Sequence, residues 1–89
     1  MNTKLIQDMI LENMETYNGI GFDCTVVDDA VWHSYWIHFH AYTSPYSNTS
    51  KLHVVGRRLN ITLKVSYNDF TIEEVMGALI TEVERSFIC

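Results

Sequence analysis

The stretch WHSYWIHFHAY, residues 32–42, decides how this chain can fold, because its side chains alternate between two kinds. Successive residues of a strand point to opposite faces of a sheet. One face would carry Val31, Tyr35, Ile37, Phe39 and Ala41, together with His33. The other would carry Trp32, Ser34, Trp36, His38, His40 and Tyr42. We therefore expect a strand from about Val31 to Thr43 with an apolar core face and a second face rich in aromatic and imidazole groups.

A strand is also predicted on each side of this stretch. From Ile20 the pattern has a period of two, and Asp28-Asp29 is typical of a turn. Later in the chain, one apolar set alternates with polar residues, namely Leu59, Ile61, Leu63 and Val65. Upstream of it, Leu52 and Val54 have the opposite parity, which a bulge at Gly56 would explain. The polar segment 44–50 contains turn formers and predicts an exposed loop.

The N-terminal segment predicts an amphipathic helix from about Lys4 to Tyr17. Thr3 is the expected cap, and Asn18-Gly19 is the expected stop because both residues accept a left-handed backbone.

The C-terminal segment predicts a second helix, from about Ile72 to Phe87, with the clearest local signal in the chain. Thr71 and Glu74 stand at the positions of a capping box. Phe70 and Val75 stand at those of a hydrophobic staple.

Together these elements predict an α+β fold of order α-β-β-β-α, formed by residues 1–89 as a single domain. Each helix has one apolar side, and three antiparallel strands offer a single apolar face to both. We expect an open-faced sandwich in which the other face of the sheet is uncovered.

Composition narrows the classes of function. The formal net charge is -5, so the summed field repels phosphate, and neither direct nucleic-acid binding nor binding to anionic lipid is expected. The first helix is interrupted by Asp8, Glu12 and Glu15, which argues against a signal peptide or a membrane span. Only two cysteines occur, too few for a disulfide framework, which favours a cytoplasmic location.

Catalysis and metal binding are not supported by a motif. His38 and His40 would lie about 7 Å apart on one face of a strand, and His53 could add a third ligand. No carboxylate or cysteine pattern of the usual spacing accompanies them. Cys24 has no nucleophile elbow around it. We therefore expect no enzyme and no cofactor, and we keep a histidine-dependent metal protein as a third alternative.

The face of the sheet opposite the helices is the candidate interaction site, because exposed tryptophan and tyrosine are enriched at binding hot spots. Its expected residues are Trp32, Trp36, His38, His40 and Tyr42, with Arg58 and Lys64 beside them. The simplest alternative is that these side chains only cover a thin sheet. A partner could be another protein, or a second copy that uses the open face or an edge of the sheet.

Single-stranded nucleic acid or a small ligand is the alternative partner, because aromatic side chains with cationic neighbours can stack bases. Arg57, Arg58 and Lys64 would then contact the backbone. The order of elements resembles that of double-stranded RNA-binding domains. Those domains have lysines at the start of the last helix, where this chain has Asn68-Asp69-Phe70-Thr71 followed by Ile72, Glu73 and Glu74. That departure argues against the assignment.

The acidic residues of the last helix suggest a different surface. Asp69, Glu73, Glu74, Glu82 and Glu84 could present a row of charges to a basic groove, as nucleic-acid-mimicking inhibitors do. A solvated helix face would show the same residues.

In overall format the chain resembles small phage-encoded counter-defence or host-inhibitor proteins: fewer than a hundred residues, acidic, aromatic-rich and without a catalytic motif. The resemblance implies a stoichiometric inhibitor that binds a host or defence complex in the host cytoplasm, and a nucleic-acid-processing complex is one such partner.

Overall fold

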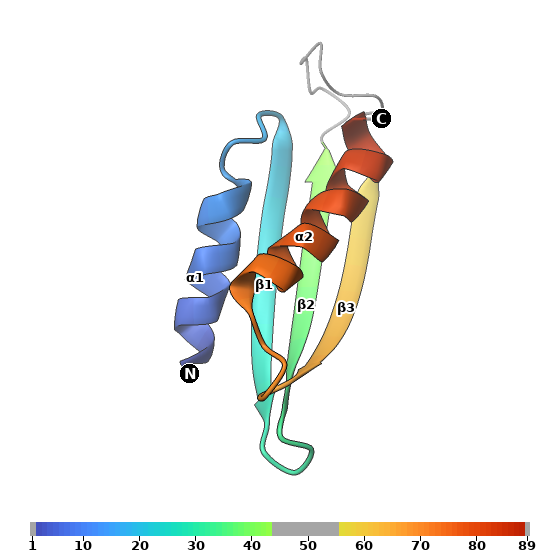
Figure 1. Cartoon of the computed structure of the whole chain (residues 1–89). Helices are drawn as coiled ribbons and strands as arrows, with labels where there is room; N and C mark the ends of the chain where they lie inside the picture. The colour runs from blue at the N-terminus through green and yellow to red at the C-terminus, as the bar shows by residue number, and fades with distance from the viewer. Residues whose placement is uncertain (1, 44–55, 89) are drawn as a thin grey trace.

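Three antiparallel strands form a sheet whose order, β1-β2-β3, follows the order of the chain. The computed structural model describes residues 2–43 and 56–88. Its elements are α1 (Thr3–Met14), β1 (Ile20–Asp29), β2 (Ser34–Thr43), β3 (Arg58–Ser66), α2 (Ile72–Val83) and a π-helical turn, η1 (Glu84–Ile88). Both helices lie on the same side of the sheet (Figure 1). The predicted α+β fold with the order α-β-β-β-α is confirmed.

The turn between β1 and β2 differs from the prediction. β1 continues through Asp29, and residues 30–33 make the turn, so β2 begins at Ser34 rather than at Val31. The carboxylate of Asp29 accepts a hydrogen bond from the backbone N–H of Trp32 at 3.3 Å, and His33 has a φ of 49°. This left-handed residue reverses the chain. Val31 is consequently 82% exposed and does not belong to the core.

The first helix is shorter than predicted and begins with a different cap. The side chain of Asn2, not of Thr3, accepts from the backbone N–H of Lys4 at 2.8 Å. The helix ends at Met14, where the backbone N–H of Tyr17 donates to the Met14 carbonyl at 3.1 Å and tightens the last turn. Gly19 has a φ of 83°, so the predicted left-handed residue is present, but it lies beyond the helix end.

The second helix begins as predicted. The hydroxyl of Thr71 accepts from the backbone N–H of Glu74 at 3.3 Å, which is the first half of the capping box. The helical path reaches the predicted end near Phe87, but its last turn widens into η1. The guanidinium of Arg57 donates to the Ser86 carbonyl in that turn at 2.8 Å, and a cation near the end of a helix is stabilising.

The core lies between the helices and one face of the sheet. It is formed by one cluster of buried side chains, among them Ile6, Ile10, Met14, Ile37, Phe39, Leu79, Val83 and Phe87. The hydroxyl of Tyr17 donates to the carboxylate of Glu84 at 3.0 Å, which joins the segment after α1 to η1. None of the described helices is long and apolar enough to cross a bilayer.

The two edges of the sheet are covered differently. Along β1, Cys24 and Val26 are buried, and the Gln7 side chain of α1 accepts from the backbone N–H of Val26 at 2.9 Å. Along β3, the residues that face the helices are only half-buried; these are Leu59, Ile61, Leu63 and Val65. Gly56, before β3, has a φ of 68°, while Leu52, Val54 and the predicted loop 44–50 lie outside the described residues.

Candidate interaction face

The sheet face that points away from the helices carries the predicted interaction residues, and we term it the open face. Its strand residues are Gly21, Asp23, Thr25, Val27, Asp29, Ser34, Trp36, His38, His40, Tyr42, Arg58, Asn60, Thr62, Lys64 and Ser66. The strand register arranges them in rows across β1, β2 and β3: Gly21–Tyr42–Arg58, Asp23–His40–Asn60, Thr25–His38–Thr62, Val27–Trp36–Lys64 and Asp29–Ser34–Ser66. Aromatic rings therefore stand at both ends of the face and polar groups at its centre.

At one end of the open face, one carboxylate binds the Trp36 indole and the Trp32 backbone, and one ammonium lies near both indole rings. Asp29 accepts from the Trp36 indole N–H at 3.1 Å with one oxygen and from the Trp32 backbone N–H with the other. The ammonium of Lys64 lies 5.1 Å from the Trp32 ring centre and 5.3 Å from that of Trp36, within cation–π range. Trp32 belongs to the turn rather than to the predicted strand, yet it still joins this cluster. Its side chain is 67% exposed.

At the other end, Tyr42 lies against the backbone of Gly21. A Cβ at position 21 would stand 2.3 Å from Cζ of Tyr42, so the ring occupies space that only glycine leaves free. Tyr42 is 50% exposed and borders a shallow hollow of about 240 Å³ that Arg58 also lines. Trp36 and Tyr42 are six residues apart in β2, a span of about 20 Å.

The two histidines of β2 are hydrogen-bonded to β3 rather than to each other. His40 Nδ1 lies 2.6 Å from Asn60 Oδ1, so the ring nitrogen donates to the amide oxygen. His38 Nδ1 lies 3.4 Å from the Thr62 hydroxyl. Within residues 2–43 and 56–88, no three histidine, cysteine, aspartate or glutamate side chains converge in a group that could hold a metal. His53, the predicted third ligand, lies outside the described residues.

Cys24, the cysteine weighed as a nucleophile, points into the core and is 4% exposed. Burial, together with the nearby charge of Asp23, raises the pKa of its thiol to about 11. A catalytic cysteine needs a lowered pKa and access to substrate. Cys24 therefore has the properties of a structural residue.

The predicted cationic contacts do not all share the open face. Arg58 and Lys64 belong to it, whereas the guanidinium of Arg57 is directed to η1. The acidic residues Asp69, Glu73 and Glu74 are exposed at the start of α2, in the helix layer. There Glu73 and Glu74 complement the positive end of the helix dipole. The predicted site residues thus form two separate surfaces.

Two residues that shape the open face were not among the predicted site residues. The sequence pattern places Asp29 only in a turn. Because an aspartate next to a turn often accepts backbone N–H groups, its bond to the Trp32 N–H could have been predicted. The period-two pattern from Ile20 places Gly21 in the first strand and indicates no role for it on the open face. Its role in seating Tyr42 depends on the cross-strand register, which one strand alone does not reveal.

The chain matches no protein-family profile, and neither a curated protein nor a solved structure is significantly similar to it.

Proposed function

We propose that this protein is a non-catalytic protein-binding module that contacts its partner through the open face. By the format described above, it would act as a stoichiometric inhibitor of a host or defence complex. The observation that carries the proposal is a set of aromatic side chains that are exposed yet held in place. Trp32 is 67% exposed and Tyr42 50%, while Trp36 is tied to Asp29.

Fixed aromatic side chains suit this role because they supply large apolar area with little loss of conformational entropy on binding. The bond to Asp29 holds the Trp36 indole, and the Lys64 ammonium contacts both indole rings, before any partner arrives. Gly21 seats Tyr42 in the same way. Between these anchors, His38, His40 and their β3 neighbours supply polar groups that can set the orientation of a partner.

The distribution of charge also favours the open face as the binding surface. The open face has two acidic residues, Asp23 and Asp29, and two basic ones, Arg58 and Lys64, on a chain of net charge -5. Most of the acidic excess therefore lies elsewhere, largely on the helix layer. A nearly neutral, aromatic face is easier to desolvate than an acidic one.

The test is affinity capture from a native host extract, comparing the wild type with the Trp32→Ala, Trp36→Ala double variant. We expect the wild type to retain a partner in stoichiometric amount and the double variant to lose it. Leu5→Ala is the matched control, because Leu5 is also an exposed apolar residue, at 52%, but belongs to α1. Equal loss with Leu5→Ala, or no partner for the wild type, would contradict the proposal.

The second candidate is a single-stranded nucleic-acid binder, favoured by the cation beside aromatic rings at each end of the face. Titration with a labelled oligonucleotide separates the two, because phosphate contacts weaken steeply as salt increases. Binding at low salt that Lys64→Ala and Arg58→Ala both weaken would support this candidate. An oligonucleotide that does not bind at low salt excludes it.

The acidic residues of the helix layer define a separate mode of inhibition, in which they meet a basic groove. Glu73→Gln with Glu74→Gln would then slow capture and reduce its salt dependence, whereas the Trp32→Ala, Trp36→Ala variant would not.

The metal alternative predicts a different result: zinc would raise the melting temperature of the wild type but not of His38→Ala.

A further inference from the structure

We propose that two copies of this chain associate through the free edges of their β3 strands, so that the two sheets become one. This inference is independent of the partner of the open face. It rests on the backbone groups of β3, on the pattern of its side chains, and on a groove that the fold leaves open beside it.

The hydrogen-bond pattern shows which backbone groups of β3 face outward. At the two ends of the β2–β3 ladder, the Thr43 N–H donates to the Arg57 carbonyl and the Tyr67 N–H to the His33 carbonyl, both at 2.9 Å. Bonded residues alternate along an antiparallel ladder, so the odd-numbered residues of β3 bond to β2. The even-numbered ones direct their N–H and C=O groups to the free edge: Arg58, Asn60, Thr62, Lys64 and Ser66.

Within residues 2–43 and 56–88, these outward groups have no intramolecular substitute for a strand. At the β1 edge, the Gln7 side chain accepts from the Val26 N–H. In the part of the chain that the structure describes, no side chain accepts from an outward N–H of β3. A row of unpaired backbone donors and acceptors is a template for another strand.

The sequence of β3 is complementary to itself when two copies run antiparallel. Centred on Thr62, the pairing uses every residue of Arg58–Ser66. On the open face it places Asn60 opposite Lys64 and Arg58 opposite Ser66, and on the helix side it places Leu59 opposite Val65 and Ile61 opposite Leu63. Apolar residues meet apolar ones, and no like charges are opposed.

A neighbouring register is less favourable. Centred on Ile61, the same pairing would place Arg58 opposite Lys64 of the second copy, and like charges directly opposite each other are destabilising. It would also leave the end of β3 unpaired. The side chains therefore select the Thr62-centred register.

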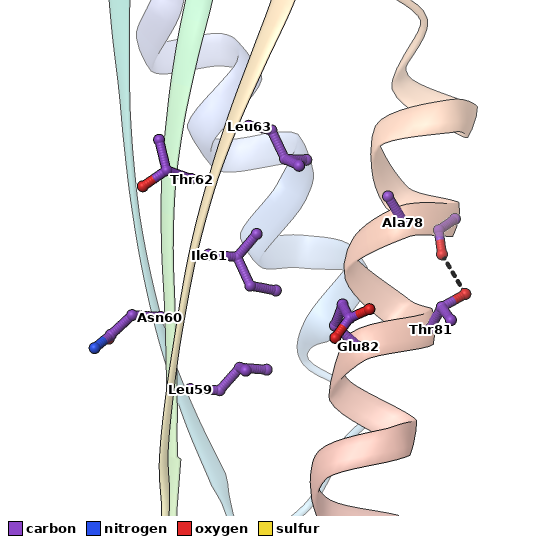
Figure 2. Close-up of a pocket in the computed structure, with 9 residues that line it drawn as sticks. Leu59, Asn60, Ile61, Thr62, Leu63, Ala78, Thr81 and Glu82 are labelled. Atoms are coloured by element: carbon purple, nitrogen blue, oxygen red, sulfur yellow. Dashed lines mark hydrogen bonds between the residues drawn. The ribbon is translucent and has the colours of Figure 1, made fainter.

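The side of the sandwich next to β3 is open and apolar. Figure 2 shows Leu59, Ile61 and Leu63 pointing from β3 toward α2, while Asn60 and Thr62 point the other way. Between β3 and α2 lies a groove of about 660 Å³, which Gly77 and Ala78 border on the helix side. A Cβ added at Gly77 would meet nothing within 4 Å. Apolar side chains of a second copy can therefore cover the half-buried residues of β3.

One interaction opposes this association. Glu82 lines the groove and Glu74 lies at its continuation along β3, so two helix layers brought together would also bring carboxylates together. Arg85 lies 3.3 Å from Glu82 and offsets part of that charge. Because salt screens repulsion between exposed charges, the dimer should tighten as ionic strength increases.

A consequence of the two-fold pairing is that both open faces lie on the same side of the joined sheet. The two-fold axis runs perpendicular to the sheet. The helix layers of both copies therefore lie on one side of the joined sheet, and the open faces of both copies lie on the other. The β1 strands become the outer edges of the joined sheet. The dimer would present a face twice as wide as that of one chain.

The test is sedimentation equilibrium over a range of protein concentrations. We expect the wild type to form a species of twice 10.3 kDa. Thr62→Lys should weaken the dimer at least about tenfold, because it opposes two ammonium groups at the symmetry axis. Thr25→Lys is the matched control: Thr25 lies in the same row and on the same face and is also exposed, but it belongs to β1.

A disulfide test reports the register directly. In a Cys89→Ser background, Thr62→Cys should give a disulfide-linked dimer, because opposed residues of a bonded pair have Cα atoms about 5.5 Å apart, within disulfide range. Thr25→Cys should not. A wild type that stays monomeric at millimolar concentration overturns the proposal, as does a dimer that Thr25→Lys weakens as much as Thr62→Lys. The Trp32→Ala, Trp36→Ala variant tests the open face and not the β3 edge. Its loss of partner capture would therefore change neither the sedimentation result nor the disulfide result.

Discussion

The two edge strands of this sheet, β1 and β3, have the same alternation but different surroundings. Each pairs with β2 on one side and directs every second residue toward the helices. Cys24 and Val26 on β1 are buried, whereas Ile61 and Leu63 on β3 are half-buried. α1 lies along β1, and its Gln7 accepts from one outward N–H of that strand, whereas a groove separates β3 from α2. Alternation thus specifies which side chains face the helices, but not how completely the helices cover them.

Thiol reactivity should show the largest difference between the two strands. Cys24 and Ile61 occupy the same row, on either side of Phe39. In a Cys89→Ser background, we expect Cys24 to react with a thiol reagent at pH 8 at least about a hundredfold more slowly than a cysteine placed by Ile61→Cys in a chain that also carries Cys24→Ala. A pKa raised from 9.0 to about 11 accounts for a factor of that size through the thiolate fraction alone.

Unfolding in urea is the control, since it should make the two rates equal. The same pKa has a consequence for stability, because the unfolded chain ionises at Cys24 before the folded one does. Between about pH 9 and 11 the free energy of unfolding should therefore fall by a component that Cys24→Ala lacks. Equal labelling rates in the native state would mean that β1 and β3 are covered alike.

Core truncation gives the second largest difference. Val26→Ala on β1 should reduce the free energy of unfolding by about 1.5–3 kcal/mol, from lost burial and a residual cavity. Val65→Ala on β3 removes the same atoms from a half-buried site and should cost about half as much. Urea denaturation at low protein concentration measures both. If dimerisation covers β3, the effect of Val65→Ala will grow as protein concentration increases.

The smallest of the three effects concerns the edge itself. Gln7→Ala removes the acceptor of the Val26 N–H and should reduce the free energy of unfolding by about 0.5–1.5 kcal/mol. Hydrogen exchange of the Val26 amide should accelerate. Gln7→Glu keeps an acceptor at that position and should preserve the protection, so a loss equal to that of Gln7→Ala would assign the effect to packing instead.

The elements and faces of this fold were predictable from the sequence because they depend on local periodicity. Ile37 and Phe39 are buried, and Trp36 and His38 point away from the helices, as the two-residue pattern of β2 requires. The cap at Thr71 was equally predictable, because the capping box is a local motif.

The features that sequence reasoning missed depend on contacts between elements or on turn geometry. Val31 continues the alternation but lies in the turn, where the Trp32 backbone N–H donates to the Asp29 carboxylate. Arg57 was grouped with Arg58 as a candidate phosphate contact, yet it donates to Ser86, far along the chain. Which edge is covered depends on where α1 lies, and no pattern within a strand encodes that.

The alternating bond pattern also governs where the sheet tolerates proline, which lacks the N–H that a ladder needs. Every second N–H of β2 bonds to β1 and the others to β3, so a proline at any position of β2 would remove a ladder hydrogen bond. On β3, the even-numbered positions could lose their N–H without breaking a bond to any residue that the structure describes. On β1, the same holds for the outward positions except Val26, whose N–H donates to the Gln7 side chain. The single proline of the chain, Pro45, follows β2 in the sequence and lies outside the described residues.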